Sequence, residues 1–352
     1  MTTRQQMKQA ADTSRQREPT APIASGFMRA LRFDGAAPAL VTNHPQPQPQ
    51  PGEALVRTIK AAVSAIDIEL CRGLLEFSGT LGHEFAGVVE VINGEIGADL
   101  VGTRIVGSVE AVCGRCDMCQ AGLKSHCRQR TVLGMQGRDG CLADWFVLPV
   151  NNLVVVPDSI DNDQAVFVES LASAIQAARQ LTIEGKPYIT VLGDGALGLI
   201  MVQVMARLNA SVRLIGRYSE NLALCEKWQI KHRHVDDIGR RADQDIVVDC
   251  TGSPTGLELA MQLVRPRGTI VLKTMFACQP SPAAQTDLTT VVMKELSLLG
   301  SRSGPIGEAV SMLARGEIDV VSLIGKRMSL NDGPAVLQAA SRPGMLKVLV
   351  DI

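Results

Sequence analysis

The sequence predicts an α/β protein with two domains, a β-rich domain followed by a doubly wound parallel sheet. A length of 352 residues suits two domains of roughly 150 residues each. Residues 53–156 consist of short β-type segments separated by Gly, Asp and Asn, which is the pattern of a mostly antiparallel or barrel-like domain. After about residue 158, helix-length segments alternate with buried strands, which is typical of a parallel sheet with helices on both faces.

The expected elements follow one another along the chain. Residues 1–27 are polar and predict a flexible extension before a folded part that begins near Met28. The proline-rich residues 45–51 predict an extended loop between two early strands. In the β-rich region, strands are expected at 87–92, 103–109 and 144–149. In the second region, helices are expected at 165–181 and 196–209, and strands at 188–193, 211–216, 245–250, 269–274 and finally 346–352.

The composition excludes several classes of function. Hydrophobic residues make up 46% of the chain and charged residues 20%, as in ordinary globular proteins. The balance of 35 Lys and Arg against 36 Asp and Glu argues against nucleic-acid or polybasic membrane binding. No basic-then-apolar leader begins the chain, and the most apolar stretch, residues 189–206, contains Asp194. We therefore expect a cytoplasmic protein with a small-molecule substrate and no nucleic-acid or membrane partner.

Four of the nine cysteines form the strongest motif, a C-x2-C-x2-C-x7-C pattern made by Cys113, Cys116, Cys119 and Cys127. In a reducing compartment, cysteines this close together indicate metal binding rather than disulfides. Four thiolates suit one tetrahedral zinc ion per chain, although an iron–sulfur cluster uses similar ligands. Because four sulfurs close the coordination sphere, we expect a structural site that supplies folding energy to a segment without a core of its own.

The second motif is the glycine-rich turn Gly193-Asp194-Gly195-Ala196-Leu197-Gly198. It follows an expected strand and begins an expected helix, and this context predicts dinucleotide binding. Gly193 permits a tight turn, Gly195 lets the backbone approach a pyrophosphate, and Gly198 allows close packing of helix on strand. The pyrophosphate would lie at the N-terminus of the helix.

The end of the following strand bears on the choice of cofactor. An NAD-specific site places an acid there to hold the ribose diol, but this chain has Gly216 followed by Arg217. Loss of a carboxylate and gain of a guanidinium favour a 2′-phosphate, so we expect NADP(H) in preference to NAD(H). The alternative is that Arg217 is a solvated loop residue and that cofactor choice is relaxed.

The triplet Gly82-His83-Glu84, taken with the cysteine motif, the glycine-rich turn and residues 168–171, resembles the zinc-containing medium-chain dehydrogenase/reductase family. The resemblance covers residues 28–352 and includes 248–253, 265–269 and 346–348. It implies a GroES-like catalytic domain, split into residues 28–168 and 303–352, around a Rossmann domain at 169–302. It also implies that Thr251 and Gly252 contact the cofactor, and that the chain forms a homodimer or homotetramer with Rossmann sheets meeting edge to edge.

The early loop departs from the family pattern. The resemblance makes His83 and Glu169 candidate ligands of a catalytic zinc, with Glu84 close enough to join them. Ser64 takes the position of the family's Cys ligand, and Ile66 takes that of the Ser or Thr that accepts the substrate's hydroxyl proton. Glu69 takes the position that is often His in the proton relay, and Asp67 is expected to pair with Lys347. A serine hydroxyl binds zinc far less well than a thiolate, and Ile66 carries no transferable proton.

Three hypotheses follow for the function. The first is a dehydrogenase/reductase of small alcohols or carbonyls that keeps catalytic zinc on His83, Glu84 and Glu169. The second is a reductase without catalytic zinc that acts on an activated C=C, C=N or carbonyl group, with Ser64, Glu69 or Glu169 as hydrogen-bond donor or proton source. The third is a cofactor-binding protein on the same fold that no longer turns over.

Overall fold

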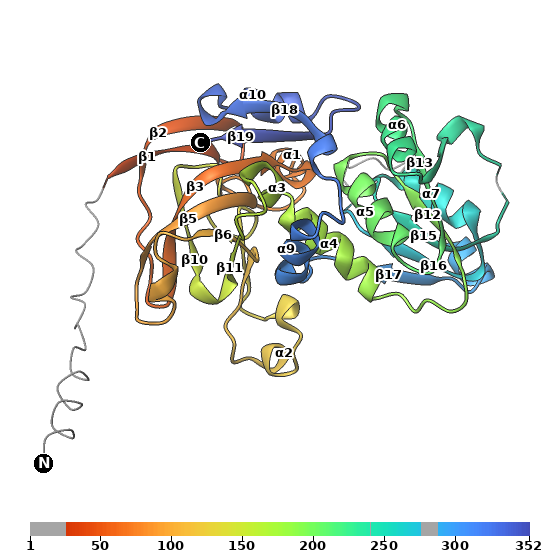
Figure 1. Cartoon of the computed structure of the whole chain (residues 1–352), viewed down its shortest axis with the longest axis horizontal. Helices are drawn as coiled ribbons and strands as arrows, with labels where there is room; N and C mark the ends of the chain where they lie inside the picture. Colours follow the sequence, from red (N-terminus) through yellow and green to blue (C-terminus); the bar gives the residue numbers. More distant parts are fainter. Residues whose placement is uncertain (1–25, 240, 276–287) are drawn as a thin grey trace, which may run out of the picture.

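The computed structural model describes residues 26–239, 241–275 and 288–352 (Figure 1). The predicted extension 1–27 lies outside these residues except for its last two, and the first strand, β1 (Phe27–Phe33), begins one residue before Met28. The predicted proline-rich loop connects β2 (Pro38–Pro45) to β3 (Glu53–Val63), as expected.

The β-rich part is built around β3, a long strand that pairs with neighbours from three regions of the sequence. Antiparallel partners of β3 are β5 (Glu84–Ile92), β10 (Trp145–Pro149) and the C-terminal strand β19 (Lys347–Asp351). The end of the chain therefore completes a sheet that its beginning started. The remaining strands of this part are β4 (Gly79–Thr80), β6 (Arg104–Gly107), β7 (Glu110–Ala111), β8 (Thr131–Leu133), β9 (Gly137–Arg138), β11 (Leu153–Val155) and β18 (Ile324–Ser329). Its helices are α1 (Ala65–Cys71), α2 (Asp117–Gln120), α3 (Asn162–Ala165) and α10 (Ala335–Ala340).

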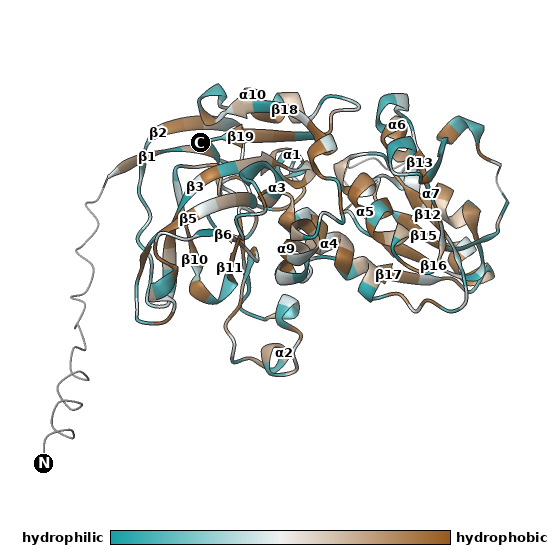
Figure 2. Cartoon of the chain, viewed as in Figure 1, coloured by the Kyte–Doolittle hydropathy of each residue, from teal (hydrophilic) through white to brown (hydrophobic). Residues whose placement is uncertain are grey.

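The second part is a fully parallel sheet with the order β14-β13-β12-β15-β16-β17 within the described residues. The inner strands of this sheet are largely brown in Figure 2, because they are apolar and covered on both faces, whereas the edge strand β14 consists of Lys and His with Arg. The strands are β12 (Tyr188–Leu192), β13 (Ser211–Gly216), β14 (Lys231–His234), β15 (Gln244–Asp249), β16 (Val264–Leu272) and β17 (Ser297–Gly300). The helices are α5 (Ala196–Ala206), α6 (Ser219–Lys227), α7 (Pro254–Leu263) and α8 (Thr289–Met293).

Two helices join the sheets. Helix α4 (Val168–Arg179) contacts α5 on the parallel sheet and also β5 of the β-rich part, and α9 (Ile306–Ala314) packs beside it (Figure 1). One buried cluster runs from Ala62 and Ala86 through Leu171 of α4 to Val191 and Val248 of the parallel sheet. This continuity holds the N-terminal end of α4 against β5, where the candidate site lies.

Candidate active site

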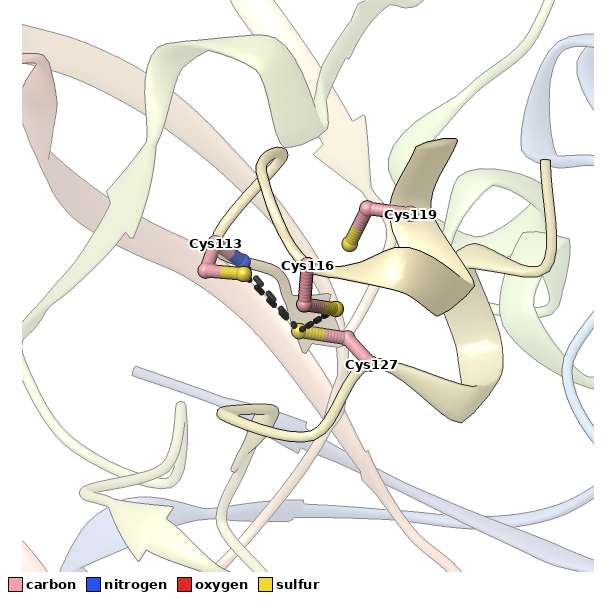
Figure 3. Close-up of side chains that lie close together, drawn as sticks. All are labelled: Cys113, Cys116, Cys119 and Cys127. Atoms are coloured by element: carbon pink, nitrogen blue, oxygen red, sulfur yellow. Dashed lines mark hydrogen bonds between the residues drawn. The ribbon is translucent and has the colours of Figure 1, made fainter. Parts of the chain in front are cut away.

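The four cysteines of the predicted zinc motif lie together on a lobe between β7 and β8. Figure 3 shows their side chains converging, and the four sulfurs all lie within 4.8 Å of one another. Cys127 Sγ is 3.5 Å from Cys113 Sγ and 3.9 Å from Cys116 Sγ. Sulfurs bound to one tetrahedral zinc at about 2.3 Å would be about 3.8 Å apart, so the geometry fits a single ion rather than a multi-iron cluster. Backbone N–H groups of Arg128 and Cys119 lower the pKa of Cys116 to about 6, which favours the thiolate.

The glycine-rich turn has the geometry that a dinucleotide requires. Gly193 has φ of 101°, which favours glycine, and a Cβ on Gly198 would lie 1.9 Å from the Gly193 carbonyl oxygen. No heavy atom lies within 4 Å of the Cβ position of Gly195, so space for a phosphate is open above it. Helix α5 begins at Ala196 without a side-chain cap, which leaves its first N–H groups to an anion. These residues fit the dinucleotide.

The end of β15 lies beside this turn. A Cβ on Gly193 would be 3.4 Å from Thr251 Cγ2, and Gly252 follows with φ of 63°. Thr251 donates its hydroxyl proton to Asp249, which fixes the loop. The structure thus brings Thr251 and Gly252 to the predicted cofactor site.

The sequence did not reveal that Asp194 supplies a carboxylate at the end of β13. Its Oδ2 accepts hydrogen bonds from the backbone N–H groups of Arg217 and Tyr218, at 2.9 and 2.7 Å. A Cβ on Gly216 would lie 2.4 Å from Asp194 Cγ, so this carboxylate fills the space that a side chain at 216 would need. An acid is therefore present where Gly216 alone indicated none. Arg217 lines a cavity of 460 Å³ together with Asp236, Thr255 and Glu258.

Three predicted residues of the catalytic centre come together from distant parts of the chain. His83 precedes β5, Glu84 begins that strand, and Glu169 lies in the first turn of α4. Their candidate ligand atoms all lie within 4.8 Å of one another. His83 and Glu84 are buried, whereas Glu169 is half-buried and is the member of the cluster that solvent reaches.

Lys347 occupies the carboxylate that Glu84 would use to bind a metal ion. Its ammonium donates to both oxygens of Glu84, at 2.9 and 2.7 Å, and the Ser170 hydroxyl donates to the same carboxylate at 2.5 Å. The expected Asp67–Lys347 pair is wrong, because β19 lies beside β3 and brings Lys347 to the start of β5 instead. A metal ion bound to Glu84 would lie next to the buried ammonium of Lys347, and the two positive charges would repel each other. Of the cluster, only His83 and Glu169 remain as ligands, fewer than the three that catalytic zinc sites use.

Asp67 pairs with His83 instead. The Asp67 carboxylate is fully buried, accepts from the N–H groups of Ser64 and Gly82, and lies 3.5 Å from His83 Nδ1. Among the described residues, Nδ1 has no hydrogen-bond partner at bonding distance. Because Nδ1 faces Asp67, Nε2 is the ring nitrogen left for a ligand on the other side.

Ser64 and Glu69 do not join the cluster in a catalytic arrangement. The Ser64 hydroxyl accepts a hydrogen bond from the Ile66 N–H at 3.0 Å and caps α1. Glu69, on the same helix, forms an ion pair with Arg72 at 2.7 Å. Its position in the sequence suggested a proton relay, but local pairing along α1 engages its carboxylate.

The electrostatics of the cluster favour protonation. Although burial lowers it, the pKa of His83 is raised to about 9 by the carboxylate of Asp67, with smaller contributions from Glu169 and Glu84. Burial and the nearby Glu84 raise the pKa of Glu169, although the charges of His83, Lys273 and Lys347 oppose the shift. The centre thus combines an imidazole that holds its proton at neutral pH with a carboxyl group whose pKa is raised.

Comparisons with known proteins agree with this geometry. Residues 50–158 match the alcohol dehydrogenase GroES-like domain, and residues 196–315 match the zinc-binding dehydrogenase domain. The chain belongs to the zinc-type medium-chain dehydrogenase family. This places it among the oxidoreductases and confirms the predicted fold class of a GroES-like domain with a Rossmann domain. The predicted domain boundaries, 28–168 with 303–352 and 169–302, stay a prediction.

Several members of this medium-chain family are similar over nearly the whole chain. Sorbitol dehydrogenase of Halalkalibacterium halodurans is 25% identical over 329 residues, covering 88% of this chain and 94% of the relative. L-threonine 3-dehydrogenase of Streptomyces avermitilis is 27% identical over 349 residues, covering 92% and 99%. A protein of Sinorhizobium meliloti 1021, described as a zinc-binding dehydrogenase and solved with NADP, is 26% identical with a TM-score of 0.81, covering 93% of this chain and all of that one.

Proposed function

We propose that the chain is an NADP(H)-dependent oxidoreductase that transfers hydride between the nicotinamide and a small alcohol or carbonyl substrate, with zinc only in the four-cysteine lobe. One observation carries the proposal: the open glycine-rich turn lies on the same edge of the parallel sheet as residues that interact with the His83–Glu169 pair. Gly193 follows β12 beside Cys250, which follows β15. Lys273 follows β16 and interacts electrostatically with both Cys250 and Glu169.

Preference for NADP(H) rests on Arg217. It directly follows β13 and lines the 460 Å³ cavity, where a 2′-phosphate could meet the guanidinium. Asp194 also places a carboxylate near this point, but two backbone N–H groups already satisfy its Oδ2. The S. meliloti neighbour solved with NADP supports the same assignment.

The protein's own residues would handle the proton that accompanies hydride transfer. When bound, the nicotinamide supplies or accepts the hydride. Glu169, half-buried and with a raised pKa, would hold a proton on its carboxyl group and give it to the substrate oxygen during reduction. His83 would hold a second proton or a hydrogen bond to the same oxygen through Nε2, because Asp67 keeps its pKa high. Glu84, which is held by Lys347, and Ser64, which caps α1, would keep Glu169 and His83 in position.

A second candidate function is reduction of an activated C=C or C=N bond without catalytic zinc. The ion pair between Glu84 and Lys347 supports this reaction as well as it supports carbonyl reduction, because both reactions then use His83 and Glu169 as proton donors. A third possibility, a protein that binds the cofactor without turnover, predicts binding with no consumption of NADPH.

Two other features support a proposed oligomeric state and cellular location of the protein. Strand β17 forms an edge of the parallel sheet in the described part of the chain, and Leu298 on it is 40% exposed. An exposed strand edge can pair with a second copy, which supports a homodimer or a homotetramer. Four thiolates that bind zinc need a reducing compartment, which supports the cytoplasm.

The decisive experiment tests the open space at the turn. Gly195→Leu would place a side chain where a pyrophosphate belongs, without a clash inside the protein. Binding of NADPH, measured by nicotinamide fluorescence, should fall at least about tenfold, with thermal stability unchanged. Gly307→Leu is the matched control, since it also lies in open space in the first turn of a helix but away from the cofactor.

Turnover then separates the candidates. Wild-type protein is assayed with polyols, aldehydes and ketones, and with enones and imines. Oxidation of polyols or reduction of simple carbonyls supports the proposal, and activity confined to enones or imines supports the second candidate. Dinucleotide binding without turnover on any of these substrates supports the third, and absence of all dinucleotide binding rejects all three.

A further inference from the structure

A cavity of 590 Å³ lies between the cysteine lobe, the C-terminal half of α4 and the carboxyl ends of β16 and β17. We call it the basic cavity, because its walls carry Lys124, His126, Arg179, Lys273 and Arg302. None of its described lining residues is Asp or Glu. The residues of the glycine-rich turn are also absent from this lining, so the cavity is not the site of the dinucleotide's pyrophosphate.

Lys273 brings a buried positive charge to this cavity. The residue is 7% exposed, and its ammonium donates to the carbonyl oxygens of Ser301 and Arg302, at 3.1 and 2.6 Å. These acceptors are neutral, and no carboxylate lies within ion-pair distance of Lys273 among the described residues. A buried cation without an ion pair is costly unless an anion comes to it.

The other cations are partly neutralised, and the guanidinium of Arg179 pairs with the Glu308 carboxylate. Arg302 donates to the Ser125 carbonyl oxygen at 2.5 Å and lies 3.6 Å from Glu110, a carboxylate that Arg130 already binds at 3.3 Å. Lys124 is exposed and has no ion-pair partner in the part of the chain that the structure describes. The potential in the cavity is therefore positive.

The cavity is also within reach of the proposed reaction centre. Helix α4 begins beside Glu169 and ends beside the cavity, which Gln176 and Arg179 line. The helix rises about 10 Å between Glu169 and Gln176. Lys273 lines the cavity and is near enough to Glu169 for the two charges to influence each other. A substrate several carbons long could react beside Glu169 and place its far end among the cations.

We propose that the basic cavity binds a carboxylate or phosphate at the far end of the substrate, which makes the protein an oxidoreductase of hydroxy acids or sugar phosphates rather than of neutral polyols. This inference rests on the proposed function. The oxyanion would accept charge-assisted hydrogen bonds from Lys124 and Arg302 and would neutralise the buried charge of Lys273.

The test compares charged and neutral substrates of matched length on the zinc-loaded full chain. Values of kcat/KM with the bound dinucleotide are measured for sorbitol, gluconate and sorbitol 6-phosphate. At least one charged compound should exceed sorbitol by about tenfold or more, the factor expected for one charge-assisted hydrogen bond. Lys124→Gln should remove most of that preference, because it should lower kcat/KM for the charged compounds far more than for sorbitol. Lys186→Gln, an equally exposed lysine outside the cavity, is the control.

Calorimetry keeps the proposal testable if turnover is absent. Binding of sorbitol 6-phosphate, gluconate and inorganic phosphate is measured with and without Lys124→Gln. Binding of a charged polyol that Lys124→Gln weakens supports the proposal. Equal kcat/KM for charged and neutral substrates overturns it, as does a Lys124→Gln effect that is the same for both. Inorganic phosphate that binds without competing against either charged polyol also overturns it. NADPH fluorescence reports separately on the proposed function, so the two failures are distinguishable.

Discussion

Lys347 and Glu84 form a buried ion pair, with side chains only 7% and 2% exposed, at the centre of the candidate site. The ammonium contacts both carboxylate oxygens, and Ser170 donates to one of them. This pair removes Glu84 from the set of possible metal ligands and leaves His83 and Glu169 as the chemically available groups. Ser64 replaces the family's Cys ligand, and Lys347 occupies Glu84. Both observations therefore argue against a catalytic zinc ion at this site.

The available ligands predict the zinc content of the purified protein. We expect purified protein to contain one zinc per chain, bound by the four cysteines, because two protein ligands do not retain a catalytic ion. Ser64→Cys restores a thiol at the position of the family's Cys ligand, and we expect it to raise the content towards two. Mass spectrometry of metals on dialysed protein measures both values. Two zinc ions in the wild type would contradict this expectation, and Ser159→Cys, at an exposed position in another region, controls for adventitious binding.

Breaking the Glu84–Lys347 pair should be strongly destabilising. Glu84→Gln leaves a buried ammonium without its counter-ion, which typically costs about 3–5 kcal/mol of unfolding free energy. Glu90→Gln removes the same charge from the exposed Arg57–Glu90 pair and should cost less than about 1 kcal/mol. Urea unfolding followed by circular dichroism compares the two variants. Similar losses would show that Glu84 is not held as the structure indicates.

The stability of the protein should depend on pH through His83. Although burial lowers it, the Asp67 carboxylate and its neighbours raise the pKa of His83 from 6.5 to about 9. The folded state therefore binds the proton more tightly, and this stabilisation is complete below about pH 6.5 and is lost as pH rises towards 9. Burial lowers the pKa of Lys273 to about 8, which gives an opposite slope above that pH. The window from pH 6.5 to 8 therefore contains the contribution of His83 and lies below the range in which Lys273 opposes it.

Asp67→Asn provides the measurement. The unfolding free energy of the wild type should fall across this window, whereas that of Asp67→Asn should change less, because the main stabilising charge is gone. Across these 1.5 pH units the difference is at most about 2 kcal/mol, since one proton contributes about 1.4 kcal/mol per unit. Parallel pH profiles for the two proteins would show that Asp67 does not control the His83 proton.

Arg217 should decide between the two dinucleotides. Arg217→Ala removes the guanidinium that lines the 460 Å³ cavity at the end of β13, and we expect NADPH binding to weaken about tenfold while NADH binding stays unchanged. Arg233→Ala, an exposed arginine on the neighbouring strand β14 that does not line this cavity, is the control. Fluorescence titrations with both cofactors measure the ratio. Equal losses for NADPH and NADH would reject a role in recognising the 2′-phosphate.

Features encoded by contiguous residues were predictable. The four cysteines converge because their spacing and the short helix α2 fit one lobe, and the glycine-rich turn opens at Gly195 because a strand and a helix flank it directly. The replacement of Cys by Ser64 was also visible, since it needs only a position within a motif. Such features depend on local backbone geometry, which neighbouring residues determine.

Only the tertiary structure decided which charges meet. Lys347 reaches Glu84 rather than Asp67 because the last strand pairs with β3, a contact between residues hundreds of positions apart. Asp194 fills the space over Gly216, and the basic cavity gathers cations from the lobe, α4 and the parallel sheet. Partners of this kind depend on how remote segments pack. The sequence around a charged residue does not indicate which residue of opposite charge will lie next to it in the folded protein.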